Sequence, residues 1–145
     1  MTQGLPTSGQ LATMLLEAAE TAERLQAEYW AAWNAARTAR VNRDLTRDNV
    51  SAAAYASSLI DGKNEAVRAV QLANILNENW PLTAVEETLH AADSDVKQIE
   101  GLLEVARTHR SALHDLVSLR VAELGVQAAT GRRAIAQVSD WHNKH

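Results

Sequence analysis

Apolar residues recur along the chain at alternating spacings of four and three, the repeat of a helix that packs against another helix. In a first stretch the repeat comprises Leu11, Leu15, Ala18, Ala22, Leu25, Tyr29, Ala32, Ala36 and Ala39. In a second stretch it comprises Leu82, Val85, Leu89, Ala92, Val96, Ile99, Leu103, Ala106, Leu113, Val117 and Leu124. The pattern therefore predicts an all-α fold built on two long amphipathic helices.

The residues outside these stretches set the expected limits of each element. We expect a flexible tail over 1–8, a long helix over 9–44, short helices and a turn over 45–80, a second long helix over 82–124 and a C-terminal helical extension over 126–145. A chain of 145 residues fits a single helical domain.

Turn and capping residues organise the segment between the two long helices. Thr46 is a possible cap for a first short helix. Asp61 and Gly62 predict a turn, and Asn64 predicts the N-cap of a helix that ends near Asn77. This segment is expected to close one end of the hairpin.

Similar residues mark the limits of the second long helix. Pro81 interrupts the preceding helix, and Thr83 with Glu86 has the spacing of a capping box. The second long helix is therefore expected to begin within a residue or two of Thr83. Gly125 and Gly131 predict breaks before a last short helix.

Charge predicts the direction in which the two long helices pair, since both begin acidic and end basic. Parallel pairing would set like charges side by side. Antiparallel pairing sets the basic stretch 37–47 against the acidic stretch 86–95, and the acidic stretch 17–28 against the basic stretch 107–120. Each exposed pair contributes only ~0–1 kcal/mol, so charge selects direction more than it adds stability. We expect a long antiparallel, coiled-coil-like hairpin.

A second apolar row lies beside the repeat of the second long helix. It comprises Leu102, Val105, Ala112, Leu116 and Leu119. A two-helix hairpin buries one stripe per helix, so this row needs another partner. The short internal helix, the C-terminal helix and a second copy of the chain are the alternatives. We favour a homodimer with a four-helix arrangement.

Composition excludes several classes of function. The absence of Cys excludes disulfides, thiolate catalysis and cysteine-held metals. The net charge of -4 argues against strong non-specific affinity for nucleic acid over the whole surface. The apolar run 11–16 is too short for a membrane span or a signal sequence. We therefore expect a soluble cytoplasmic protein with no membrane partner.

Two spacings of acidic side chains resemble those of metal sites. Glu87 and His90 have the Glu-x-x-His spacing of di-metal carboxylate bundles, but no second such pair exists. Glu17, Glu20 and Glu23 have a spacing like that of helical nucleotide pyrophosphohydrolases that hold magnesium, without the later Glu-x-x-Asp that such enzymes need. A metal-dependent helical nucleotide hydrolase stays an alternative. We expect no catalytic residue, metal, cofactor or small-molecule substrate.

A basic row closes the first long helix and is the candidate site for nucleic acid. It comprises Arg37, Arg40, Arg43 and Arg47. Arginines at helical spacing can contact phosphates, and Trp30 and Trp33 nearby could stack on single-stranded bases. The competing interpretation, which we favour, is that these arginines pair with the acidic start of the second long helix.

The segment Asp61-Gly62-Lys63-Asn64-Glu65, with Arg68 and Gln71 after it, precedes a long amphipathic helix. It resembles the DGKN-E-x-x-R-x-x-Q segment of small helical phage and prophage proteins of uncharacterised function. The resemblance covers about Glu17 to Leu124, and the stretch 126–145 extends beyond it. Genes for such proteins often lie near single-strand annealing recombinases.

That resemblance implies an accessory role in phage-type DNA recombination or replication, with no catalytic residues. The leading hypothesis is a non-enzymatic helical interaction protein that binds a protein partner or single-stranded DNA. Besides the hydrolase, a structural or assembly scaffold protein is an alternative.

Overall fold

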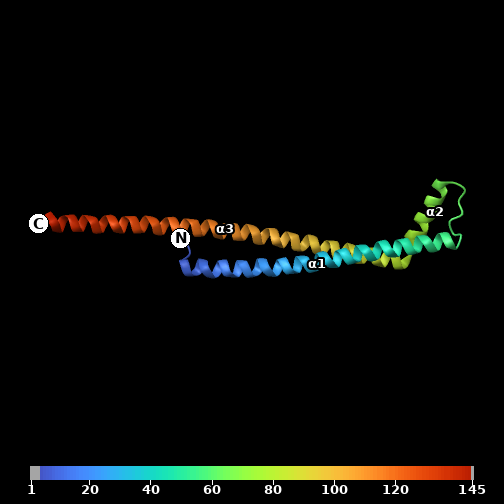
Figure 1. The fold of residues 1–145 in the computed structure, drawn as a ribbon, viewed down its shortest axis with the longest axis horizontal. Coiled ribbons are helices and arrows are strands. Elements are labelled where there is room, and N and C mark those ends of the chain that lie inside the picture. Colours follow the sequence, from blue (N-terminus) through green and yellow to red (C-terminus); the bar gives the residue numbers. More distant parts are fainter. Residues whose placement is uncertain (1–3, 145) are drawn as a thin grey trace. The chain divides into compact units, whose positions relative to one another are not determined.

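The protein, described over residues 4–144 by a computed structural model, consists of three α-helices (Figure 1). α1 spans Ser8–Ala56, α2 spans Glu65–Glu78 and α3 spans Trp80–Lys144. α1 packs against α3, which confirms the predicted all-α helical hairpin. Over the described residues there is no strand, and no helix has an apolar stretch long enough to cross a membrane.

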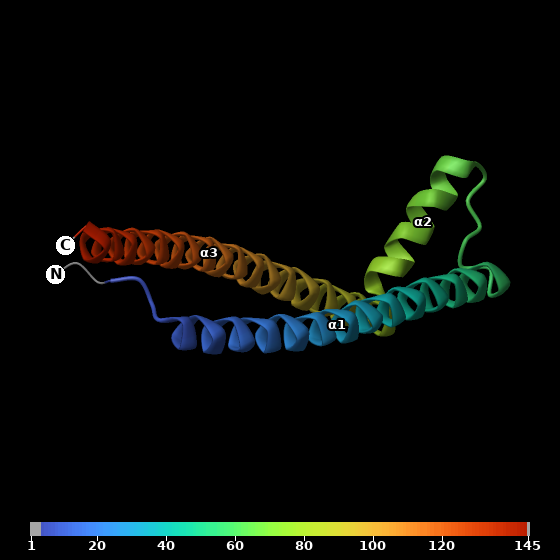
Figure 2. The same ribbon diagram turned by 60° about the vertical axis from the view of Figure 1, so that its left-hand side comes forward.

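Both long helices contribute to two compact units. The terminal unit contains residues up to Arg24 and those from Leu103 onward, and the central unit is Leu25–Leu102. In the central unit α1 and α3 run antiparallel, because Arg40 pairs with Asp93 whereas Ala53, further along α1, shares a groove with Asn79. In the terminal unit the first turns of α1 run antiparallel along α3 (Figures 1 and 2).

The predicted apolar repeats lie at the helix contacts. The most buried of their members are Leu11, Ala18, Leu25, Ala36, Ala39, Leu82, Leu89, Leu103 and Leu113. Leu113 is only 1% exposed, whereas Leu124, the last predicted member, is 42% exposed. The repeat therefore identifies the core correctly up to the point where α1 begins.

The predicted end of the first long helix is wrong, because α1 continues through the stretch 45–56 where a separate short helix was expected. Arg43, Thr46 and Val50 lie at positions that continue the repeat, and all three are half-buried. Polar side chains at two of these positions weaken the apolar pattern without interrupting the backbone. Thr46 therefore lies within α1 and is not the cap of a separate helix.

α1 ends in a Schellman motif that uses serine where glycine is usual. Ser58 has a φ of 58°, the left-handed conformation. The N–H of Leu59 donates to the carbonyl of Ala54 at 3.1 Å, and the N–H of Ser58 donates to that of Tyr55 at 3.2 Å. Because no glycine marks the site, the sequence gives little indication of this helix end.

Asparagine caps begin both later helices. Asn64 is the N-cap of α2, as predicted, and its Oδ1 accepts from the N–H of Val67 at 2.9 Å. The predicted Thr83–Glu86 capping box is wrong. The Oδ1 of Asn79 instead accepts from the N–H of Leu82 at 2.9 Å, and Pro81 occupies the first turn, where its missing N–H costs nothing. Figure 2 shows how α2 returns to the start of α3.

The predicted breaks near Gly125 and Gly131 are also wrong, since α3 is continuous to Lys144, the last described residue, and 126–144 form no separate short helix. Neither glycine has a positive φ, and neither lies close to another group. A glycine inside a helix costs about 1 kcal/mol relative to alanine but does not by itself end the helix. The expected C-terminal extension is therefore part of α3 over residues 126–144, and residue 145 lies outside the described range.

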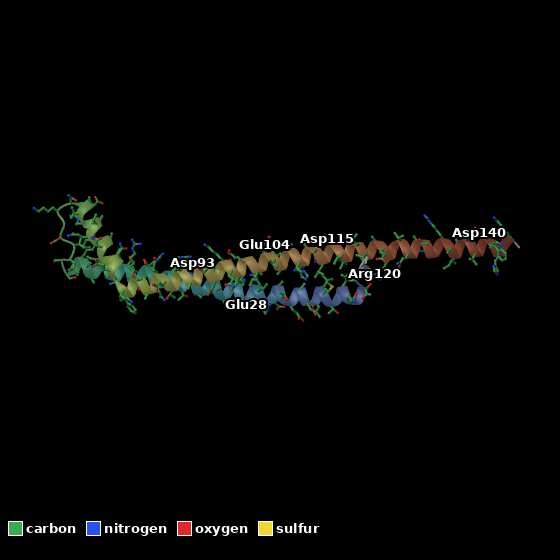
Figure 3. The ribbon with its side chains drawn as sticks, turned by 180° about the vertical axis from the view of Figure 1, so that it is seen from behind. Glu28, Asp93, Glu104, Asp115, Arg120 and Asp140 are labelled. Carbon is green, nitrogen blue, oxygen red and sulfur yellow. The ribbon has the colours of Figure 1, made fainter. Side chains whose placement is uncertain are left out.

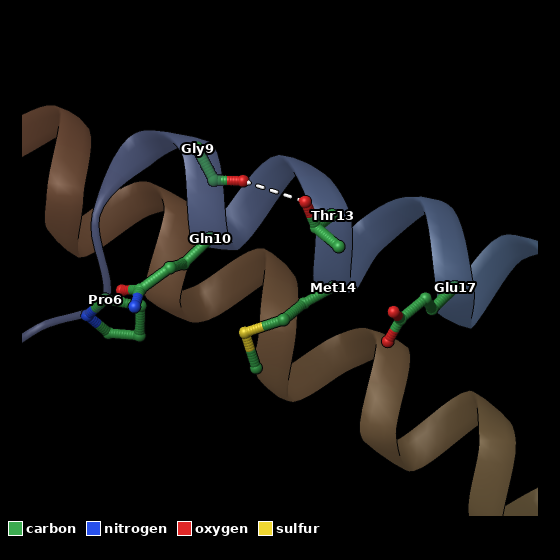
Figure 4. A pocket seen from close by; sticks show the side chains of 6 residues that line it. All are labelled: Pro6, Gly9, Gln10, Thr13, Met14 and Glu17. Carbon is green, nitrogen blue, oxygen red and sulfur yellow. Dashed lines mark hydrogen bonds between the residues drawn. The ribbon is translucent and has the colours of Figure 1, made fainter.

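The N-terminus of α1 has a capping box that begins before the predicted start. The Oγ1 of Thr7 accepts from the N–H of Gln10 at 3.2 Å, and the N–H of Thr7 donates to the Oε1 of Gln10 at 2.9 Å. One turn later the hydroxyl of Thr13 donates to the carbonyl of Gly9 (Figure 4). The Thr-x-x-Gln spacing could have revealed this start. Of the predicted tail 1–8, residues 1–3 lie outside the described range.

Candidate interaction sites

The members of the predicted basic row lie on α1 in the central unit, in different surroundings. Nη2 of Arg40 lies 3.4 Å from Oδ1 of Asp93 on α3, so the predicted cross-helix charge pairing occurs at this position. The guanidinium of Arg43 is half-buried and lies 2.8 Å from Oδ1 of Asp44, its neighbour on α1. Arg37 and Arg47 are exposed. Two of the four cations thus have carboxylate partners, which reduces the positive potential available to phosphates.

Arg37 and Arg40 also line a groove between α1 and α3 of the central unit. The Cζ atom of Arg37 lies 5.8 Å from the ring centroid of Trp33, within the range of a cation–π contact. The rings of Trp30 and Trp33 meet edge to face, with centroids 5.9 Å apart. The other lining residues are Tyr29, Ala36, Asp93, Val96 and Glu100. The groove therefore combines aromatic rings, two guanidinium groups and two carboxylates.

Two spacings in the sequence could have indicated this groove. Tyr29, Trp33 and Arg37 follow one another at intervals of four, so they share a face of α1. Asp93 and Glu100 are seven residues apart and share a face of α3. The sequence prediction included the arginines, Trp33 and, within the acidic stretch 86–95, Asp93, but it did not include Glu100.

The DGKN-E-x-x-R-x-x-Q segment closes the connection from α1 to α2. The side chain of Gln71 bridges the loop, with Nε2 donating to Oδ1 of Asp61 at 2.8 Å and Oε1 accepting from the N–H of Gly62 at 2.9 Å. Nη1 of Arg68 donates to the carbonyl of Gly62 at 3.4 Å. With the Asn64 cap, these five residues form what we term the α2 clasp.

The α2 clasp also explains the glycine in the segment. A Cβ atom on Gly62 would lie 2.6 Å from Cγ1 of Val67 and 3.0 Å from Oε1 of Gln71. No larger residue fits there without displacing these groups. Local closure of the loop therefore accounts for Asp61, Gly62, Asn64, Arg68 and Gln71, while the exposed Lys63 and Glu65 have no such role in the described contacts.

The second apolar row on α3 is mostly in contact with solvent. In the terminal unit, Val105 is 67% exposed and Leu119 is 54% exposed, while Leu116 is half-buried. Within the described part of the terminal unit no element covers Val105 or Leu119, so the end of α3 is not the partner that this row needs. The row is a candidate docking surface.

Arg120, which interrupts the predicted repeat, lies between α3 and the first turns of α1 in the terminal unit (Figure 3). Its Nη1 lies 3.1 Å from Oε2 of Glu123 on the same helix. The aliphatic part of the side chain therefore fills a core position and Nη1 pairs at the edge, while Nε is buried without a hydrogen-bond partner among the described residues. Arg107 likewise pairs with Glu104 of α3, at 4.0 Å.

Acidic and histidine side chains do not converge on a metal-binding geometry within residues 4–144. This holds for Glu17, Glu20 and Glu23, which are all exposed along α1, and for Glu87 and His90 on α3. The alternative hydrolase interpretation gains no support from the described side chains.

Comparison of the chain with protein-family models, with curated proteins and with solved structures finds no match in any of the three. What the protein does must therefore be inferred from its exposed surfaces. The two strongest are the second apolar row on α3 and the aromatic and basic groove of the central unit.

Proposed function

We propose that this chain is a non-enzymatic helical interaction protein that acts as a homodimer and binds an amphipathic helix of a protein partner. The observation that supports this most directly is the solvent exposure of Val105 and Leu119 on α3. Apolar side chains at helical spacing are the usual anchors for a helix that docks into a groove. Burying them stabilises a complex by roughly 25 cal/mol per Å² of apolar surface.

A single docked helix fits this surface better than the predicted four-helix arrangement. Four-helix packing requires a second apolar flank on both helices of the hairpin. In the terminal unit, α1 has one large and strongly exposed apolar side chain, Leu16, and its other exposed side chains include Glu17, Glu20 and Glu23. The row on α3 is therefore better suited to one incoming helix than to a second hairpin.

The setting of this interaction is part of the same proposal. The resemblance of the α2 clasp segment to small phage and prophage proteins supports an accessory role in DNA recombination or replication, in the cytoplasm. The partner would then be a protein of that machinery. A scaffold role in assembly remains the structural alternative, and large homo-oligomers would favour it.

Site-specific photocrosslinking tests the partner proposal. A benzoylphenylalanine at position 119 should form an adduct with a protein other than the chain itself, whereas the same group at the exposed Ser111 should not. The identified partner, once purified, should bind Leu119→Glu at least about tenfold more weakly than wild type, since a charge at an apolar anchor is costly. Ser111→Glu should bind as wild type does.

Adducts formed only with a second copy of the chain would contradict the partner proposal and restore the four-helix homodimer. Equal adducts at both positions, or unchanged affinity of Leu119→Glu, would also contradict it. Each of these outcomes is read from the same set of gels and titrations.

Single-stranded DNA is the second candidate ligand, because the central-unit groove brings aromatic rings and two guanidinium groups together. Bases could stack on Trp33 while Arg37 and Arg47 contact phosphates. The carboxylates of Asp93 and Glu100 in the same groove oppose phosphate binding. This candidate therefore ranks below the protein partner.

A mobility shift with single-stranded DNA at low salt distinguishes the two candidates. If the groove binds DNA, changing Arg37, Arg40 and Arg43 together to Glu should abolish the shift that wild type gives. If wild type and the triple variant both shift the DNA to the same extent, or if neither shifts it, single-stranded DNA is no longer a candidate ligand of the groove.

A further inference from the structure

Among the described residues of the terminal unit, no helix lies beside the last part of α3. Ser8 and Leu11, in the first turns of α1, share a groove with Val121 and Leu124 of α3. From Leu124 to Lys144 every described residue is exposed. Val126, Ile135, Val138 and Trp141 are each more than 60% exposed, and Asp140 in Figure 3 marks this stretch.

The sequence of this segment is poorly suited to an isolated helix. It contains Gly125 and Gly131, each of which costs about 1 kcal/mol relative to alanine in a helix interior. Thr130, Ile135 and Val138 are β-branched and add smaller costs. In proteins most of the stability of a helix comes from packing of its apolar face, so the segment 125–144 requires a partner along that face.

That face continues the contact with α1. Val117, Val121 and Leu124 line the groove described above, with Val121 at its exposed edge. From Leu124 the repeat continues through Ala128, Gly131, Ile135, Val138 and His142, again at spacings of four and three. The exposed face thus continues the α1–α3 interface that the chain already forms. Beyond Leu124, no described helix of the terminal unit occupies the place beside α3 that α1 takes upstream.

We propose that the segment 125–144 of a second copy covers this face in the antiparallel direction. This inference rests on the homodimer proposed above and assigns its contact. In a parallel dimer, the upstream part of the partner's α3 would run along the face that α1 already occupies. In an antiparallel dimer, each segment ends near the point where the other copy's α1 begins. The overlap is about 30 Å, at ~1.5 Å per residue.

The sizes of the side chains along the exposed face of 125–144 also favour antiparallel pairing of the two copies. Antiparallel pairing centred near Arg133 sets Gly131 opposite Ile135 of the second copy, and Ala128 opposite Val138 of the second copy. Each layer then combines a small and a large side chain, which fills space evenly. Parallel pairing would set Gly131 against itself and Ile135 against itself, which leaves a void in one layer and crowds the other.

The dimer joined in this way leaves the second apolar row of α3 available. Val105 and Leu119 lie upstream of the overlap. One part of α3 joins the two copies, and another part binds the protein partner. A single helix thereby serves two separate interfaces.

Cysteine crosslinking of the full chain tests the pairing, because the chain has no native cysteine. Gly131→Cys and Ile135→Cys proteins, one of them tagged, are mixed and oxidised. The antiparallel pairing predicts a mixed disulfide dimer in much higher yield than the disulfide dimer of either protein alone. Efficient crosslinking of Ile135→Cys by itself would indicate the parallel pairing and overturn the proposal.

The mass in solution supplies the second readout. Ile135→Asp should raise the dimer dissociation constant on the order of tenfold or more, because the dimer would bury an unpaired charge. Ala136→Asp introduces the same charge beside the face and should leave the mass of a dimer unchanged. A wild type that is a dimer, with Ile135→Asp equally dimeric, would overturn this contact but not the homodimer. A monomeric wild type at tens of micromolar would overturn both.

Discussion

On either side of Leu124, α3 has apolar residues at the same helical spacing, yet only one side is covered. Upstream, Leu103 and Leu113 are buried in the terminal unit. Downstream, Ile135 and Val138 lie at equivalent positions and are in contact with solvent. The difference arises because α1, the helix that covers the upstream part, begins at Ser8, which shares a groove with Val121 and Leu124.

This contrast shows that the repeat encodes contacts of two kinds. Where a second helix of the same chain is available, the repeat forms a core. Where none is available, the same pattern leaves an apolar surface that another molecule can cover. The second apolar row on α3 is a further surface of this kind.

The largest expected effect is a difference in stability loss between substitutions in the covered part of α3 and in its uncovered part. Leu113→Ala should lower the free energy of unfolding by about 2–5 kcal/mol, because Leu113 is 1% exposed and its removal leaves a cavity. Ile135→Ala, measured at a concentration where the chain is monomeric, should change it by less than about 0.5 kcal/mol. Chemical denaturation measures both. Similar losses for the two variants would show that the downstream part is covered within one chain.

Glycines test the same distinction between close packing and open space. Gly62→Ala should destabilise the protein by roughly 1–3 kcal/mol, because its new Cβ would press on Val67 and on Gln71 of the α2 clasp. Gly125→Ala meets nothing within 4 Å and should raise helicity by circular dichroism, with a gain of up to about 1 kcal/mol. A loss of helicity in Gly125→Ala would contradict the continuous α3.

A substitution at the end of α1 should have a smaller effect, and it should stabilise the protein instead of destabilising it. Ser58→Gly should stabilise the protein by about 0.5–1 kcal/mol, because glycine adopts the left-handed conformation without strain. Ser57→Gly, at the preceding residue, should destabilise it, since the Ser57 hydroxyl donates to the carbonyl of Ala53. Thermal unfolding of the two variants compares them directly. Destabilisation by Ser58→Gly would contradict the Schellman motif.

The smallest expected effect concerns the charge pairing. Asp93→Asn removes the ion pair with Arg40, whose side chain is 56% exposed, and should change stability by at most about 1 kcal/mol. The change should shrink as salt is added. An effect of several kcal/mol that persists in high salt would show that this pair determines the stability of the hairpin.

The sequence predicts the contacts of this fold better than the limits of its elements. The repeat locates the α1–α3 core and the charge gradients give its direction, because both depend on periodicity over many turns. The limits are missed at Ser58, where serine replaces the expected glycine, and at Gly125 and Gly131, which continue the helix. Tertiary context and local geometry decide such positions, and neither is visible in a spacing pattern.

The same limit applies to the candidate sites. The arginines and Trp33 are identifiable from sequence, but the carboxylate of Glu100 joins their groove only because α3 folds back along α1. The exposure of Val105 and Leu119 was also open, because a spacing pattern does not show which face of α3 is covered. Sequence shows which residues form a face, and structure shows which faces stay uncovered.

Hydrogen exchange followed by mass spectrometry at two protein concentrations tests the central claim most directly. If a second copy covers the segment 125–144, its amides should exchange rapidly in dilute protein and become protected in concentrated protein, while those around Leu113 stay protected in both. Protection of 125–144 that is the same at high and low concentration would contradict the account.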